Sequence, residues 1–241
     1  MRHVRPGPPA SPRFVPARVA GAIGLVAAAC LAVAGGALAA TIEGRVALTP
    51  ADLSFYSGAR QNAYIGQLSG SAAQHGAAPD PSDTTYGVAY VADAPPISGA
   101  SLDPLLLDQK GQRFIPRVLA VVSGQAVDFR NSDNVFHNVF SYSPPKRFDL
   151  GRYPRGKSKR LTFQKVGLIQ VFCDIHSDMR ADVVVVPSRR WAYVNADGAF
   201  RIENVPAGAH TVVVWLPRRG ERKGPVDVPG EGAVSFTLGP E

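Results

Sequence analysis

The residues best suited to chemistry lie in one short loop, where Cys173, His176 and Met179 have the spacing C-x2-H-x2-M. Apolar runs flank the loop on both sides, so we expect it to join two buried β-strands. A second imidazole, His137, lies 36 residues before Cys173. Two imidazoles and a thiolate in a plane, with a weak axial thioether, form the ligand set of a blue copper site. The sequence therefore predicts one copper ion bound by His137, Cys173, His176 and Met179.

Each of these residues also has an ordinary structural interpretation. A lone Cys behaves as a small buried hydrophobe, and a single His near aromatic residues is more often a core or surface residue than a ligand. Zinc is the main rival metal, but a structural zinc site needs a closed set of four Cys or His ligands. Only three such residues are well placed, with a thioether as the fourth, and this favours copper.

The first 39 residues have the composition of an export signal. Four arginines and no acidic residue accompany an apolar stretch, and Ala37-Leu38-Ala39 supplies small residues for cleavage before Ala40. We therefore predict a signal peptide over residues 1–39 and an exported, periplasmic protein. The alternative is an uncleaved anchor over residues 19–40, which is about long enough to span a bilayer. Only in that case would the chain contact a membrane.

Removal of this segment changes the charge and the cysteine count. It takes four of the 26 Lys and Arg residues and none of the 19 Asp and Glu residues, so the formal charge falls from +7 to +3. The remaining chain keeps one Cys and one Met, Cys173 and Met179. Exported proteins usually pair their cysteines, so a lone Cys is a free thiol, an intermolecular bridge or a ligand. The nearby Met favours a ligand.

The rest of the chain predicts an all-β protein. Gly and Pro are plentiful, with 24 and 21 residues, aromatic residues are few, and no long helical period follows residue 40. Short apolar runs separated by turn residues are typical of β-sandwiches and barrels.

From about Leu105 to Val186 the sequence resembles a cupredoxin of the plastocyanin and amicyanin type. The resemblance is carried, in order, by Phe114-Ile115-Pro116, Val127-Asp128-Phe129, Asn131-Ser132-Asp133, His137-Asn138-Val139, Leu161-Thr162-Phe163, Val166-Gly167 and the Cys173 loop, whose spacing is that of the amicyanins. It implies a Greek-key β-sandwich over residues 102–187, with His137, Cys173 and His176 as equatorial copper ligands and Met179 as the axial one. It also implies that Asn138 ties the two ligand loops together from the second shell. In place of Ser177 and Asp178, such loops often carry Pro or an apolar residue.

The segments on either side resemble a second known module. The Asp197-Gly198 turn, the F-x-I strand after it and Val205-Pro206-Ala207-Gly208 are similar to the second half of a carboxypeptidase regulatory-like (transthyretin-like) β-sandwich. Gly44-Arg45-Val46 and the strand-like run 87–91 fit the first half. We therefore predict one discontinuous sandwich of residues 41–94 and 188–241, with residues 50–85 as a flexible insertion. Two consecutive domains are the alternative.

A basic run lies between residues 146 and 160, where seven cations accompany a single acid. Such a run is usually a solvated face. The alternative is a docking site for an acidic redox partner, because complementary surface charge raises the rate of association. The residues that would take part are Arg152, Arg155, Lys157, Lys159 and Arg160. We expect no nucleic acid partner for an exported protein.

The cupredoxin resemblance implies a function in electron transfer. We expect an exported type 1 (blue) copper protein that carries single electrons between redox partners on one Cu(I)/Cu(II) ion. Nothing in the sequence supplies a second metal or an open catalytic position, so we do not expect an enzyme. The alternatives are a copper carrier or storage module that transfers no electrons, and a structural surface β-protein.

Overall fold

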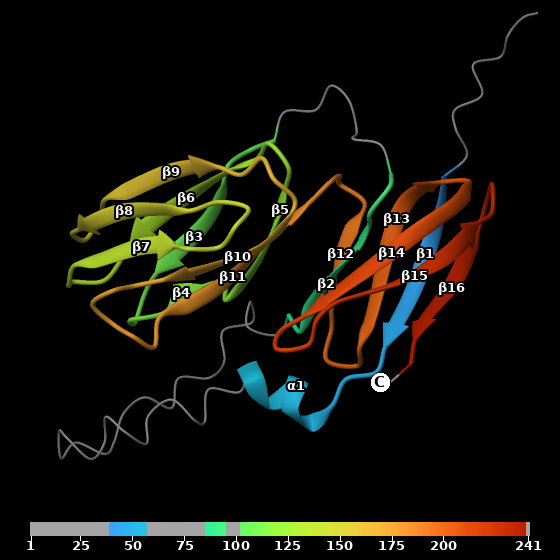
Figure 1. Cartoon of the computed structure of the whole chain (residues 1–241), viewed down its shortest axis with the longest axis horizontal. Coiled ribbons are helices and arrows are strands. Elements are labelled where there is room, and N and C mark those ends of the chain that lie inside the picture. Colours follow the sequence, from blue (N-terminus) through green and yellow to red (C-terminus); the bar gives the residue numbers. More distant parts are fainter. Residues whose placement is uncertain (1–38, 57–84, 95–101, 240–241) are drawn as a thin grey trace, which may run out of the picture. The chain divides into compact units, whose positions relative to one another are not determined.

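The computed structural model describes residues 39–56, 85–94 and 102–239. These residues are all-β apart from one short helix, as predicted, and they form two β-sandwiches (Figure 1). The predicted signal peptide lies outside the described residues except for Ala39, and the alternative anchor except for Ala39 and Ala40; these two residues begin the first strand. Among the described residues, no helix has both the length and the apolar character needed to cross a membrane.

The sandwich that carries the predicted ligands has a five-stranded sheet in the order β5-β11-β10-β7-β8 and a four-stranded sheet in the order β4-β3-β6-β9. The strands are β3 (Leu105–Gln109), β4 (Phe114–Ile115), β5 (Val118–Val122), β6 (Ala126–Asn131), β7 (His137–Ser141), β8 (Phe148–Tyr153), β9 (Ser158–Thr162), β10 (Gly167–Phe172) and β11 (Arg180–Val186). Strands β5 and β11 pair in parallel, whereas the pairs β11–β10, β10–β7 and β7–β8 are antiparallel.

The core of this sandwich follows from the alternation of side chains along its strands. In β6, Val127, Phe129 and Asn131 are buried, and the residues between them point outward. Phe129 packs near Phe163 with ring centroids 6.3 Å apart, and each such buried apolar side chain contributes about 1.5–3 kcal/mol to stability. The same alternation turns the amide of Asn131 toward the interior, where it needs hydrogen-bond partners.

The second sandwich is built from strands that precede and follow the first in sequence. Its sheets have the orders β13-β1-β16 and β12-β2-β14-β15. The strands are β1 (Ala39–Val46), β2 (Gly87–Val91), β12 (Trp191–Val194), β13 (Ala199–Pro206), β14 (Gly208–Leu216), β15 (Gly220–Val228) and β16 (Ala233–Leu238). Gly44 is needed in β1 because the ring of Phe200 on the paired strand occupies the space of a side chain, 1.9 Å from where a Cβ would lie. Assignment to a carboxypeptidase regulatory-like family, and the domain boundaries, stay predictions.

Residues 50–56 depart from the predicted flexible insertion. They form helix α1 (Pro50–Tyr56). Thr49 caps this helix, because its Oγ1 accepts the amide of Asp52 at 3.3 Å while the carboxylate of Asp52 accepts the amide of Thr49 at 2.7 Å. Arg219 also donates to Asp52 at 3.1 Å, so the helix is tied to the loop between β14 and β15. The remainder of the predicted insertion, up to residue 84, lies outside the described residues.

Candidate metal centre

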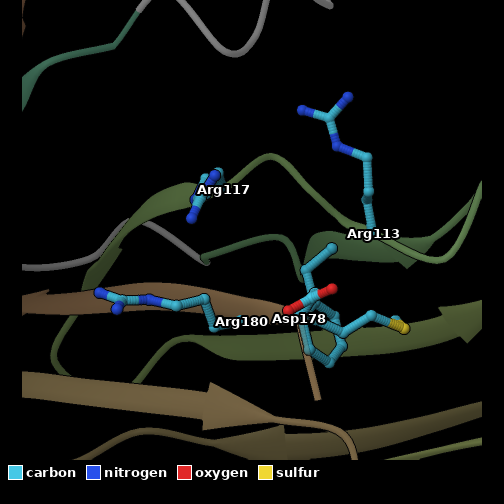
Figure 2. A pocket seen from close by; sticks show the side chains of 6 residues that line it. Arg113, Arg117, Asp178 and Arg180 are labelled. Carbon is cyan, nitrogen blue, oxygen red and sulfur yellow. The ribbon is translucent and has the colours of Figure 1, made fainter. Parts of the chain in front are cut away.

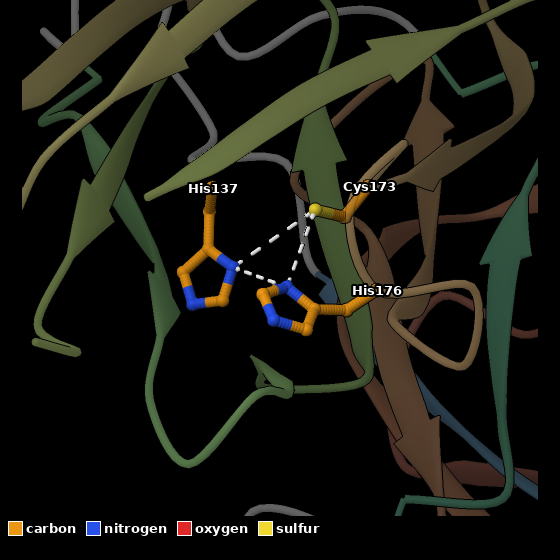
Figure 3. A group of neighbouring side chains, drawn as sticks. All are labelled: His137, Cys173 and His176. Carbon is orange, nitrogen blue, oxygen red and sulfur yellow. Dashed lines mark hydrogen bonds between the residues drawn. The ribbon is translucent and has the colours of Figure 1, made fainter. Parts of the chain in front are cut away.

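Three of the four predicted ligands meet at one end of the first sandwich. His137 begins β7, and Cys173 and His176 lie in the loop after β10. Because β7 and β10 pair antiparallel, with Phe140 opposite Phe172, the beginning of β7 lies beside the end of β10. The Nδ1 atoms of the two histidines are 3.0 Å apart, and each is 3.9 Å from Sγ of Cys173 (Figure 3).

The triangle formed by these atoms fits a first-row metal ion. A point in its plane about 2.0 Å from both nitrogens lies roughly 2.3 Å from the sulfur, which matches typical metal–imidazole and metal–thiolate distances. Two imidazole lone pairs directed at one another across 3.0 Å repel unless a cation or a proton lies between them. His137 and Cys173 are buried and His176 is partly exposed, so the three donors are held in a site largely closed to solvent. The donor set therefore suits copper.

Met179 lies at the end of the same loop and is buried in the core cluster that contains Cys173. Backbone hydrogen bonds close the loop: the amide of Met179 donates to the carbonyl of His176 at 3.0 Å, and the amide of Cys173 donates to the carbonyl of Met179 at 3.3 Å. These bonds set the positions of Cys173 and His176 relative to one another. The role of Met179 as the axial ligand stays a prediction.

Asn138 connects the two segments that carry the ligands. It is 2% exposed, and its Oδ1 accepts the backbone amide of Asp174 at 2.7 Å. Asn138 follows His137 and Asp174 follows Cys173, so this one bond joins the first ligand to the loop of the other three. A bond of this kind is the tie between the two ligand segments that the sequence predicted for Asn138.

Sequence reasoning missed the carboxylate that contacts the first ligand. Nε2 of His137 lies 2.9 Å from Oδ2 of Asp133, which also accepts the amide of Gln112 at 2.8 Å. Partial burial opposes ionisation of Asp133. Hydrogen bonds from the Gln112 and Gly111 amides and from His137 nevertheless lower the pKa of its carboxyl below the usual value. The only signal in the sequence was an Asp four residues before a His, which is too common a spacing to be informative.

Burial favours a neutral ring for the second imidazole. Burial lowers the pKa of His176, the neighbouring His137 lowers it further, and Asp133 acts in the opposite direction. A lowered pKa favours the neutral ring at neutral pH, and only a neutral imidazole can offer a lone pair to a metal.

A small pocket lies beside the ligand loop, with a volume of about 10 Å³. Its lining consists of Arg113, Phe114, Arg117, Asp178, Met179 and Arg180 (Figure 2). A volume of this size holds about one water molecule, so it cannot take an organic substrate.

Exposed apolar residues lie next to two of the predicted ligands in the sequence. Val135 and Phe136 precede His137 and are 42% and 56% exposed, and Ile175 precedes His176 and is 39% exposed. These exposed apolar residues stand next to two of the predicted ligands in the sequence, together with exposed polar residues such as Asn134 and Asp174.

The structure divides the predicted docking residues into two groups. Arg155 and Lys157 are exposed in the turn between β8 and β9. This turn hydrogen-bonds to the segment before His137, since the amide of Gly156 donates to the carbonyl of Asn131 at 2.7 Å and the amide of Asn131 donates to the carbonyl of Lys157 at 2.9 Å. Arg152 also lies at this end, where it pairs with Asp174 at 3.0 Å.

The other two predicted docking residues have partners along the strands. Arg160 pairs with Asp128 at 2.6 Å. Lys159 donates to the carbonyl of Leu150, and its Nζ lies 5.2 Å from the ring centroid of Tyr153. Acidic residues far away in the sequence thus balance part of the basic run.

No protein-family model matches the chain, and no curated protein matches it. Among solved structures, it is similar to a copper-containing nitrite reductase (NirK) from Thermus scotoductus SA-01, with 25% identity over 39% of this chain and 25% of that chain, and a TM-score of 0.33. The chain thus spans a quarter of the length of the reductase. It is also similar to amicyanin from Paracoccus versutus, with 19% identity over 40% and 96% of the two chains and a TM-score of 0.33. A Cu(I) form of an amicyanin mutant has 22% identity over 40% and 97%, again with a TM-score of 0.33. These similarities are too weak to identify a family, so the function is inferred from the site itself.

Proposed function

We propose that this chain binds one copper ion at His137, Cys173 and His176, with Met179 as the axial ligand, and carries single electrons between redox proteins. The observation that supports this most strongly is the triangle of two Nδ1 atoms and one Sγ, with sides of 3.0, 3.9 and 3.9 Å. A His₂Cys site with a weak axial thioether is the ligand set of electron-transfer copper. The bound copper would supply a one-electron Cu(I)/Cu(II) couple.

The protein's part in such a reaction is to keep the ligands still. His137 is fixed at the beginning of a strand, and the loop of Cys173, His176 and Met179 is closed by its own hydrogen bonds. Asn138 joins the two segments. A set of ligands that moves little between oxidation states lowers the reorganisation that electron transfer requires, and the thiolate and thioether suit Cu(I) while imidazole suits both states.

We also propose that partners dock on the end of the sandwich that carries the ligands. Val135, Phe136 and Ile175 are exposed apolar residues next to His137 and His176 in the sequence, and Arg155 and Lys157 lie in the turn that hydrogen-bonds to the segment before His137. An acidic redox protein would complement these cations, which would raise its rate of association. The protein would act as a carrier without catalysing a reaction, outside the cytoplasm after export by residues 1–39, or held at the membrane if residues 19–40 are kept.

The visible spectrum of the purified protein with Cu(II) tests the electron-transfer proposal. An electron-transfer site should bind one equivalent and show the intense thiolate-to-copper absorption of a blue site, with reversible one-electron reduction by voltammetry. A copper carrier would bind the ion without this combination of colour and reversible couple. Absence of stoichiometric Cu(II) binding, or a colourless Cu(II) complex, would refute the proposal.

A further inference from the structure

We propose that Asp133 is a positioning residue that holds His137 in the ligating tautomer and stabilises the oxidised state of the metal through the imidazole. This inference rests on the proposed copper site, which it deepens. Asp133 is not a ligand in the proposed set, because its carboxylate contacts the side of the His137 ring opposite the Cys173 sulfur.

The tautomer follows from the surroundings of the ring. The His137 side chain is 0% exposed, so neither nitrogen can exchange its partner for bulk water. Nε2 lies 2.9 Å from Oδ2 of Asp133, an acceptor, and Nδ1 points toward Cys173 and His176. A neutral imidazole has one N–H, which the carboxylate draws to Nε2. The lone pair on Nδ1 is then directed at the metal position before any metal binds.

The carboxylate itself is held rigidly. Its Oδ1 accepts the amide of Gly111 at 2.6 Å, and its Oδ2 accepts the amide of Gln112 at 2.8 Å. Both donors lie in the turn between β3 and β4 with positive φ, 63° and 55°, a conformation that is unfavourable for a residue with a side chain such as Gln112. Asn131 holds the Asp133 backbone, because its Oδ1 accepts the Asp133 amide at 2.9 Å. The turn is therefore shaped to present two donors to this carboxylate.

An ionised carboxylate hydrogen-bonded to a ligand changes the metal as well as the ring. It makes the imidazole a stronger donor, and its charge favours the more highly charged metal ion. Cu(II) therefore gains more than Cu(I), and the reduction potential falls. His176, on a partly exposed loop, is the ligand facing solvent, so the two imidazoles have different environments.

The variant Asp133→Asn tests the charge. The amide keeps the shape of the side chain. In either orientation, however, its NH2 group faces a backbone N–H that now donates to the carboxylate, that of Gly111 or that of Gln112. Cu(II) affinity is expected to fall by about 10–100-fold, as is typical for loss of a group behind a ligand. Cu(I) affinity should fall less, so the potential measured by voltammetry should rise.

Asp174→Asn is the matched control. It also removes one carboxylate from a residue next to a ligand, but that carboxylate pairs with Arg152. The inference predicts a clearly smaller rise in potential than for Asp133→Asn. It is overturned if Asp133→Asn keeps the wild-type potential and Cu(II) affinity, or if both variants shift the potential equally.

A second measurement needs neither copper nor the variant. In the metal-free wild-type protein, ¹⁵N NMR of labelled histidine at pH 7 should show His137 protonated at Nε2 and bare at Nδ1. The opposite tautomer would overturn the inference even if Asp133→Asn fails to fold. A failure to bind copper in the wild type would instead refute the proposed function, and the tautomer would still be decided.

Discussion

Replacing Asn131 with Ala should destabilise the sandwich of strands β3 to β11, which carries the predicted ligands and is called the ligand sandwich below. The hydrogen-bond partners of Asn131 are not themselves ligands. The side chain is 0% exposed and makes three hydrogen bonds. Its Nδ2 donates to the carbonyls of Val135 at 2.8 Å and Tyr153 at 3.0 Å, and its Oδ1 accepts the amide of Asp133 at 2.9 Å. Each partner left unsatisfied costs about 1–3 kcal/mol. We expect the free energy of unfolding to fall by about 3–5 kcal/mol. This lies toward the lower end of the three costs added together, because Val135 is close to solvent and water can replace part of its lost bond.

Amide hydrogen exchange in the metal-free protein is the appropriate assay. Both tryptophans, Trp191 and Trp215, lie on β12 and β14, so their fluorescence does not report specifically on the sandwich that carries the predicted ligands. Exchange at the amides of Phe129 and Ile169, in the two sheets of the ligand sandwich, gives its opening free energy directly.

Asn134→Ala is the control for this prediction, since Asn134 is an exposed residue of the same segment. It should change the opening free energy by less than about 0.5 kcal/mol. If Asn131→Ala costs under about 1 kcal/mol, or no more than the control, then the three bonds do not hold the segment and the reasoning is wrong. Copper affinity should fall with stability, because the same segment carries Asp133 and His137.

Three further predictions concern the site, the surface and the core. Cys173→Ser should abolish the blue colour with Cu(II), yet the metal-free variant should still give a cooperative thermal transition by circular dichroism, because strands supply the core; a chain unfolded without copper would contradict this. The double variant Arg155→Glu/Lys157→Glu should slow electron transfer to an acidic partner by at least about 10-fold at low salt. Lys146→Glu/Lys165→Glu, which makes the same charge change near the far end of β10, should not; equal stopped-flow rates for the two variants would exclude docking at the ligand end. Burial raises the pKa of Asp182 above 3.8, and Arg180 only partly opposes this. The buried Asp182 therefore contributes its full share of stability below the unfolded pKa, where it is protonated in both states. It loses this contribution as pH rises through the folded pKa, because the charged carboxylate is buried. In denaturation at several pH values, the free energy of unfolding of Asp182→Asn should rise relative to that of the wild type as pH rises above 3.8. A free energy of unfolding that instead rises faster in the wild type than in the variant would refute the sign.

The sequence alone determined the features that depend on neighbouring residues. The ligand loop could be predicted because Cys173, His176 and Met179 are close in the chain and apolar runs flank them. The all-β class followed from composition and short apolar runs for the same local reason. Helix α1 was equally local and was missed, although Thr49, with Asp52 three residues later and Pro at the first helical position, is a recognisable start signal.

Only the tertiary structure decided what surrounds the ligands. The approach of His137 to within 3.9 Å of Cys173 depends on the pairing of β7 with β10, which no local pattern encodes. The role of Asp133 depends on the turn between β3 and β4, about 20 residues earlier in the chain, whose amides point at its carboxylate. The pairing of Arg160 with Asp128 likewise required the register of β6 with β9. Hydrogen bonds and ion pairs act over a few ångströms, so they are set by which strands lie side by side, and sequence separation says little about them.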